Sequence, residues 1–136
     1  MALILIDTGP LYALADRGDG GHHQAVAFFE KTKETLMVCA SVIPEVCYLF
    51  HKFLGPRAET AFIGSLQKGE INIENLEPGD IDRILEILER RPELGFVDAS
   101  TIAVAERLRI VKIATFDRRH FASFKPKHAR AFEIVP

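Results

Sequence analysis

Short apolar runs alternate with amphipathic stretches from one end of the chain to the other. Continuous or alternating apolar residues predict five strands, at Ala2–Ile6, Leu36–Ala40, Glu70–Asn75, Ile110–Ala114 and Ala131–Val135. Most of the stretches between them carry apolar residues at helical spacing. Because parallel strands need crossover connections, this order predicts an α/β protein in which helices cover both faces of a parallel sheet.

Turn and capping residues set the limits of the predicted helices. Pro10 suits the first turn of a helix, Ser41 suits an N-cap, and Gly55-Pro56 ends the helix that follows Ser41. Pro78 opens a later helix, which ends before Pro92. The predicted helices follow Pro10 and cover residues 22–32, 41–54, 57–67, 78–91 and 99–108. In sheets of this kind, ligands bind beyond the carboxyl ends of the strands.

Composition places the chain among ordinary globular proteins. Its 136 residues are 48% hydrophobic and 26% charged, which fits one domain over residues 1–136. Its apolar runs fall far short of the roughly 20 residues of a membrane span. The N-terminus lacks the basic start of a signal peptide, and Cys39 and Cys47 lie among apolar residues. We therefore expect a cytoplasmic protein with no membrane association and with reduced thiols.

Charge is unevenly distributed along the chain. The net charge is −2, but residues 118–132 contain five cations and no acid. The rest of the chain carries 12 cations against 19 acids. A local basic segment on an acidic protein suggests contact with a polyanion, although a solvated loop explains the charge alone equally well.

Four acids are predicted to meet at the carboxyl edge of the sheet. Asp7 ends the first strand and Asp117 follows the fourth, while Glu45 and Asp98 lie at the starts of helices. Each has an ordinary structural explanation, since Asp favours turns and N-caps and Glu45 favours a helix N-terminus. Four such residues on one edge are much harder to explain in this way.

Four neighbouring carboxylates repel one another unless a cation binds between them. Mg²⁺ prefers oxygen ligands and keeps several waters. Phosphodiester hydrolysis uses such ions to activate water and to stabilise the leaving oxygen. Thr8 and Thr115 flank two of the acids and are candidates to orient a carboxylate or a water, although packing at a strand end explains them equally well.

Five short motifs follow one another along the chain: Asp7-Thr8-Gly9-Pro10-Leu11-Tyr12-Ala13-Leu14, His22-His23, Pro44-Glu45-Val46, Val97-Asp98-Ala99 and Thr115-Phe116-Asp117-Arg118-Arg119-His120-Phe121. This ordered set resembles the PIN-domain nucleases, and most closely the ribonuclease toxins of VapBC-type toxin–antitoxin pairs, from Leu3 to about Phe121. The resemblance implies a three-layer α/β/α PIN-like domain with a four- to five-stranded parallel sheet. It also implies Mg²⁺ or Mn²⁺ dependence, endoribonuclease activity and a homodimer. The metal-binding and catalytic acids of the family fall on Asp7, Glu45, Asp98 and Asp117.

The predicted function is therefore that of a metal-dependent endoribonuclease acting as a toxin. We expect Arg118, Arg119 and Lys125 to hold the RNA backbone. His22, His23 and His120 are interpreted as structural or RNA-contacting, because nothing in the sequence brings them together. The largely apolar helix from Val46 to Phe53 indicates a groove for a dimer partner or for an antitoxin.

Three alternatives remain open. A phosphatase with Asp7 as nucleophile usually has a second Asp two residues later, where this chain has Gly9. A catalytically inactive PIN-like RNA-binding module is a second alternative, against which the complete set of four acids argues. A PIN-domain nuclease of RNA processing is the third, and the sequence does not separate it from a toxin.

Overall fold

Residues 2–136, which the computed structural model describes, form one five-stranded sheet in which every strand is parallel to its neighbours. The strands are β1 (Leu3–Ile6), β2 (Thr35–Cys39), β3 (Asn72–Glu74), β4 (Lys112–Ala114) and β5 (Glu133–Val135). Their order across the sheet is β3-β2-β1-β4-β5, so β1 is central. The predicted parallel sheet is confirmed. The predicted domain begins at Met1, which lies outside the described residues.

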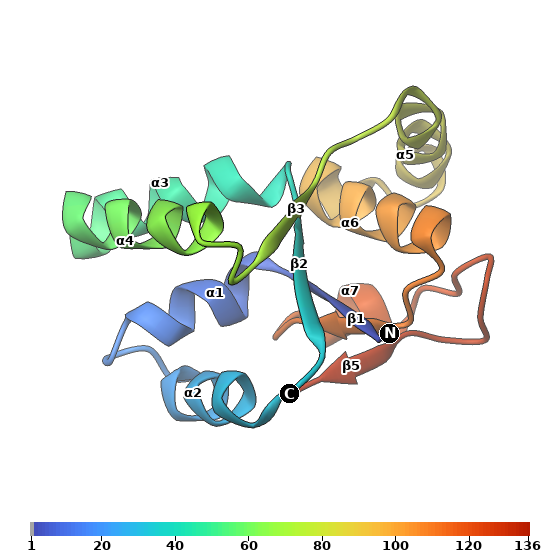
Figure 1. Ribbon diagram of the computed structural model, residues 1–136. Helices are drawn as coiled ribbons and strands as arrows, with labels where there is room; N and C mark the ends of the chain where they lie inside the picture. Colours follow the sequence, from blue (N-terminus) through green and yellow to red (C-terminus); the bar gives the residue numbers. More distant parts are fainter. Residues whose placement is uncertain (1) are drawn as a thin grey trace.

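Helices cover both faces of this sheet. Over residues 2–136 they are α1 (Thr8–Ala15), α2 (His22–Lys31), α3 (Val42–Leu54), α4 (Pro56–Gln67), α5 (Pro78–Arg90), α6 (Gly95–Leu108) and α7 (Arg118–Ala122), with a short 3₁₀ turn at Pro92–Leu94. Helices α1 to α4 lie on one side of the sheet and α5 and α6 on the other (Figure 1). This arrangement confirms the three-layer α/β/α fold. None of the described helices has the length and apolarity needed to cross a membrane.

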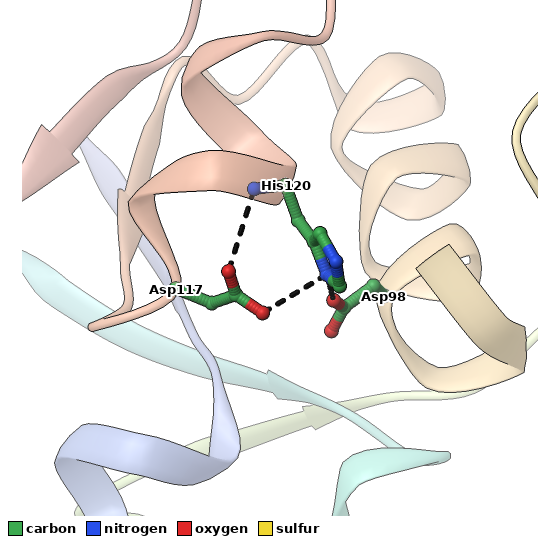
Figure 2. Close-up of side chains that lie close together, drawn as sticks. All are labelled: Asp98, Asp117 and His120. Atoms are coloured by element: carbon green, nitrogen blue, oxygen red, sulfur yellow. Dashed lines mark hydrogen bonds and ion pairs between the residues drawn. The ribbon is translucent and has the colours of Figure 1, made fainter. Parts of the chain in front are cut away.

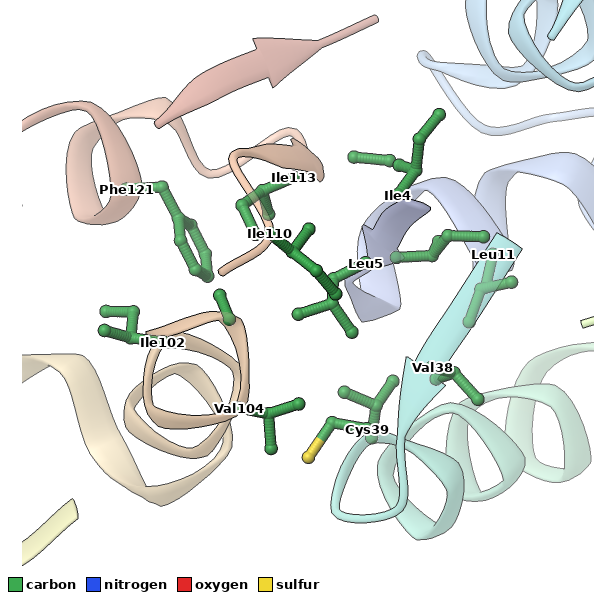
Figure 3. Close-up of a cluster of buried hydrophobic side chains, with 14 of the residues drawn as sticks. Ile4, Leu5, Leu11, Val38, Cys39, Ile102, Val104, Ile110, Ile113 and Phe121 are labelled. Atoms are coloured by element: carbon green, nitrogen blue, oxygen red, sulfur yellow. The ribbon is translucent and has the colours of Figure 1, made fainter. Parts of the chain in front are cut away.

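The hydrophobic core centres on β1 and α6. In β1, Ile4, Leu5 and Ile6 are at most 1% exposed, as the continuous apolar run predicts for a central parallel strand. In α6 every residue from position 99 to 105 is buried, because the helix packs against both the sheet and α5. Side chains from these two elements meet in one cluster with Val38, Ile113 and Phe121 (Figure 3). The start of α6 is thereby held beside the sheet.

Several predicted boundaries were wrong. The last three strands are shorter than predicted because each pairs through three residues only: β3 with β2, and β4 with both β1 and β5. Helix α6 begins at Gly95 and not at Ala99, so Asp98 lies inside the first turn and does not cap the helix. Ser41 occupies the N-cap of α3, but its hydroxyl forms hydrogen bonds with the side chains of Ser100 and Cys39 and none with the backbone N–H groups of the helix.

The helix α7 was not predicted. Asp117 is its N-cap, and the Asp117 carboxylate accepts a hydrogen bond from the backbone N–H of His120 at 3.4 Å. Such a cap supports a short helix, although five residues are too few to show a helical repeat. The buried side chain of Phe121 then anchors α7 against the core. The basic segment of the sequence therefore starts in a helix and not in a loop.

Phe116, which precedes the N-cap of α7, packs against Gly9 in α1 and against Gly21 at the N-cap of α2. A Cβ atom built on Gly21 would lie 2.7 Å from the Phe116 ring, and one on Gly9 would lie 3.3 Å from it. Gly21 therefore has to lack a side chain so that the ring can lie over the start of α2. Apart from Gly20 itself and its two chain neighbours, no described residue has an atom within 4 Å of a Cβ built on Gly20.

We expect Gly21→Ala to destabilise the protein by about 1–3 kcal/mol, because the added methyl group has to displace the Phe116 ring. Gly20→Ala is the matched control and should change the free energy of unfolding by less than about 0.5 kcal/mol. Urea unfolding followed by circular dichroism measures both changes. Equal stability of the two variants would show that Phe116 moves freely.

Candidate functional site

The site begins where β1 and β4 end side by side. The backbone N–H of Asp7 donates to the carbonyl oxygen of Ala114 at 2.8 Å, which extends the pairing of β1 and β4 by one residue. This pairing places the Thr115 hydroxyl next to Asp7, where it donates to Asp7 Oδ2 at 2.9 Å. The Asp117 backbone N–H in turn donates to the Thr115 hydroxyl oxygen at 2.9 Å. Thr115 thus links the two acids that follow strands.

The other two predicted acids lie in the first turns of α3 and α6, where the positive end of the helix dipole favours a carboxylate. Glu45 is largely exposed, and its Oε1 accepts a hydrogen bond of 2.6 Å from the Thr8 hydroxyl. Asp98 is held between the core and α7, and its side chain is 14% exposed. Both threonines that were predicted to support the site therefore hydrogen-bond to one of its acids.

Asp98 and Asp117 converge on the imidazole of His120 (Figure 2). His120 Nδ1 lies 2.6 Å from Asp98 Oδ2 and 2.9 Å from Asp117 Oδ2. One ligand atom from each of the three residues lies within 4.8 Å of the other two. Over residues 2–136, this is the one group of three or more His, Cys, Asp or Glu side chains that meets this criterion.

Asp7 and Glu45 lie outside this tightest group, but their charges act on it. Burial is the largest cause that raises the pKa of Asp7, from 3.8 to about 6, and the negative charge of Asp98 is the second. Glu45 adds a smaller effect in the same direction. The pKa of Asp98 is also raised, mainly by burial, although the His120 hydrogen bond opposes the shift. Each of the four predicted acids thus repels at least one of the others at this edge of the sheet.

The sequence left His120 interpreted as structural or RNA-contacting, and the structure places its ring against two of the predicted acids. Its convergence with Asp98 depends on the packing of α7 against α6, which no local pattern in the sequence reports. The other two histidines weighed with it lie elsewhere. His22 Nδ1 contacts the carbonyl oxygen of Ala13 at 2.8 Å, and the exposed His23 ring packs edge-on against His22.

A hollow of about 560 Å³ opens beside these acids. Its lining contains Asp7, Gly9, Phe116, Asp117, Arg118 and Arg119. Two of the three cations predicted to bind RNA are therefore next to the acids. Lys125, the third, lies at a separate hollow with Arg83, Arg90 and Arg91. The Arg118 guanidinium also donates to the carbonyl oxygen of Pro136 at 2.8 Å, which holds the C-terminus near this hollow.

A parallel α/β/α sheet with acids gathered at its carboxyl edge defines a class of nuclease-like domain, and comparison with known proteins gives the family. The chain belongs to the PIN domain family, whose model matches residues 4–125. Within that family it is VapC-like. It is 28% identical to the ribonuclease VapC26 of Mycobacterium tuberculosis, over 98% of this chain and 100% of the relative.

Solved structures agree with this placement. The crystal structure of Mycobacterium tuberculosis VapC20, a sarcin-ricin loop cleaving toxin, has a TM-score of 0.82 and 26% identity to this chain. That match covers 93% of this chain and 98% of VapC20. A toxin–antitoxin complex from Klebsiella pneumoniae has a TM-score of 0.70 and 21% identity, with coverage of 89% and 92%, and so shares the fold.

We expect Asp7→Asn to stabilise the protein in the absence of divalent ions at neutral pH. The folded-state pKa of about 6 exceeds the ordinary value of 3.8, so ionisation of Asp7 costs stability as the pH rises from about 4 through 6, and the full cost is present above that. Asn does not ionise, and the gain is therefore on the order of 2 kcal/mol at pH 7.5 and small at pH 4.

Urea unfolding in the presence of a chelator, at both pH values, measures this difference. Asp82→Asn on α5 is the control, because that side chain is exposed and should give no pH-dependent change. A gain of the same size at both pH values would contradict the electrostatic explanation.

Proposed function

We propose that this chain is a divalent-metal-dependent endoribonuclease and the toxin of a toxin–antitoxin pair. The observation that carries the proposal is the convergence of Asp98, Asp117 and His120 beside the buried Asp7. The relative VapC26, which is named as a ribonuclease, supports the substrate class. We assign catalysis and metal binding to Asp7, Glu45, Asp98 and Asp117, in one PIN domain that spans residues 1–136.

The donor set fits a hard divalent ion such as Mg²⁺ or Mn²⁺. Carboxylate oxygens are the ligands that these ions prefer. The four acids at this edge supply carboxylates, and His120 is the fifth group there. Asp7 is only 7% exposed, and its carboxylate is costly to ionise there without a compensating cation. A bound ion would supply a water of lowered pKa and would compensate negative charge on the phosphate.

Other side chains of this protein would orient the acids and bind the RNA. Thr115 and Thr8 fix the orientations of Asp7 and Glu45 by hydrogen bonds of 2.9 and 2.6 Å. Arg118 and Arg119 lie at the hollow beside Asp117, where they would neutralise phosphates of the RNA strand. The half-buried Phe116 lines the same hollow and offers a flat apolar surface for a base of single-stranded RNA.

An antitoxin is the proposed protein partner, and the exposed apolar face of α3 is its proposed docking surface. Tyr48 and Phe53 are 61% and 60% exposed, whereas Phe50 and Phe62 are buried in the core. Leu14 of α1 is also exposed, and the ring of Tyr12 meets Phe53 edge-on, so the apolar surface continues from α3 onto α1. An amphipathic helix of a partner suits such a surface.

Assembly and location follow from the same proposal. Exposed aromatic side chains on α3 also suit a homodimer, which the resemblance to VapC-type toxins implies. An enzyme acting on cellular RNA is expected to work in the cytoplasm. The RNA-processing alternative predicts the same catalytic site without an antitoxin. Expression of the chain separates the two functions, because a toxin should slow growth and the product of a neighbouring gene should relieve that effect.

We expect Asp98→Asn to lower the rate of RNA cleavage at least about 100-fold in the presence of Mg²⁺ or Mn²⁺, because it removes a negative ligand without changing the shape of the side chain. Cleavage of a fluorescently labelled RNA under single-turnover conditions measures the rate. Glu89→Gln on the exposed side of α5 is the control and should cleave like the wild type. Cleavage at the wild-type rate by Asp98→Asn, in a preparation free of contaminating nuclease, would exclude the proposed site.

Replacement of Arg118 and Arg119 by Ala should weaken RNA binding and flatten its salt dependence. Each lost phosphate contact lowers the slope of log affinity against log salt by up to about 0.7 for a single strand. Fluorescence anisotropy at several salt concentrations, with Asp98→Asn in the background to prevent cleavage, measures the slope. Lys33→Ala removes an exposed cation just before β2, at the amino edge of the sheet, and should leave the slope unchanged. An unchanged slope in the Arg variant would place the RNA elsewhere.

A further inference from the structure

His120 is held in place from two directions. On the backbone side, the N-cap bond to Asp117 and the buried side chain of Phe121 fix α7 against the core. On the side-chain side, Nδ1 lies 2.6 Å from Asp98 Oδ2 and 2.9 Å from Asp117 Oδ2 (Figure 2). The side chain is 22% exposed, so one ring nitrogen faces the carboxylates and the ring is mostly shielded from solvent.

The other histidines of the chain have different surroundings. The ring nitrogens of His22 and His128 contact backbone carbonyl oxygens, at 2.8 and 2.7 Å, and so serve the fold. His51 Nδ1 lies 3.0 Å from one carboxylate, that of Glu59, but its side chain is 62% exposed and a single acid is not a binding site. Of the rings with a nitrogen contact in the described structure, His120 is the one whose nitrogen faces two carboxylates.

We propose that His120 Nδ1 is a third protein ligand of the divalent ion, with Asp98 and Asp117, and that this ligand makes the site prefer Mn²⁺ to Mg²⁺. The inference rests on the proposed function, because it requires an ion at this edge of the sheet. It adds a residue to the four acids that the sequence pattern indicates and assigns a preference between the two metals.

The present distances already suit coordination. In an octahedral site with bonds of about 2.1 Å, neighbouring ligand atoms lie about 3 Å apart. The two Nδ1 to oxygen distances, 2.6 and 2.9 Å, are close to that value, and one ligand atom of each of the three residues lies within 4.8 Å of the other two. Coordination through Nδ1 leaves the ring proton on Nε2.

The metal preference follows from the kind of donor atom. Mg²⁺ selects oxygen ligands and retains its waters, whereas imidazole nitrogen suits transition-metal ions. Replacing one oxygen ligand by nitrogen therefore penalises Mg²⁺ more than Mn²⁺. The alternative role for His120 is to orient the two carboxylates by hydrogen bonds from outside the coordination sphere. In that case the ring would not select between the metals.

Electron spin-echo spectroscopy of the full chain loaded with Mn²⁺ separates the two roles, because a directly bound nitrogen modulates the echo. We expect nitrogen modulation in the wild type, a changed modulation frequency when histidine is labelled with ¹⁵N, and loss of the signal in His120→Gln. We also expect His120→Gln to weaken Mn²⁺ binding roughly 10-fold or more by calorimetry and Mg²⁺ binding by a clearly smaller factor. His51→Gln is the matched control and should change none of these measurements.

Two results would overturn the inference in different ways. Mn²⁺ bound without nitrogen modulation in the wild type would leave the proposed function standing and place His120 outside the coordination sphere. If the wild type bound neither Mn²⁺ nor Mg²⁺, both the inference and the proposed metal dependence would fail. The labelling measurement uses the wild type, so the test does not depend on whether His120→Gln folds.

Discussion

Repulsion among carboxylates at the carboxyl edge of the sheet is the constraint on which the rest of this structure depends. The pKa of Asp7 is raised to about 6 because the side chain is buried and lies near the charge of Asp98. The chain tolerates this cost because β1, which ends just before Asp7, is central in the sheet, and its residues Ile4, Leu5 and Ile6 are at most 1% exposed. The stability of the core therefore offsets an arrangement that is unfavourable until a cation compensates it.

Each of the four acids has a hydrogen-bonding partner in the same region. Thr115 donates to Asp7, Thr8 donates to Glu45, and the His120 imidazole bridges Asp98 and Asp117. The Thr8 and Thr115 hydroxyls are neutral, so they orient Glu45 and Asp7 without the charge compensation that Lys or Arg would give. The site is thus organised in advance while its negative potential is retained for a cation.

The sequence predicts the scaffold of this site better than its details. Continuous apolar runs and intervening helices determine the parallel sheet, and the positions of Asp7 and Asp117 follow from the strand ends. The role of His120 does not follow, because it depends on contact between α7 and α6 across 22 positions of sequence. The Ser41 hydroxyl shows the same limit, since its partner Ser100 lies 59 positions away and outcompetes local capping. Tertiary contacts of this kind have no period and no local signature in the sequence.

The short helix α7 joins the two halves of the proposed chemistry. It presents His120 towards the acids, and it places Arg118 and Arg119 at the adjacent hollow. The basic segment that is continuous in sequence is therefore divided in space, because Lys125 lies past the end of α7 beside three arginines at another hollow. Since one five-residue helix carries both sets of side chains, a displacement of α7 would change metal binding and RNA binding together. The Asp117 cap and the buried Phe121, which hold this helix, thus couple the stability of the fold to both steps of the proposed function.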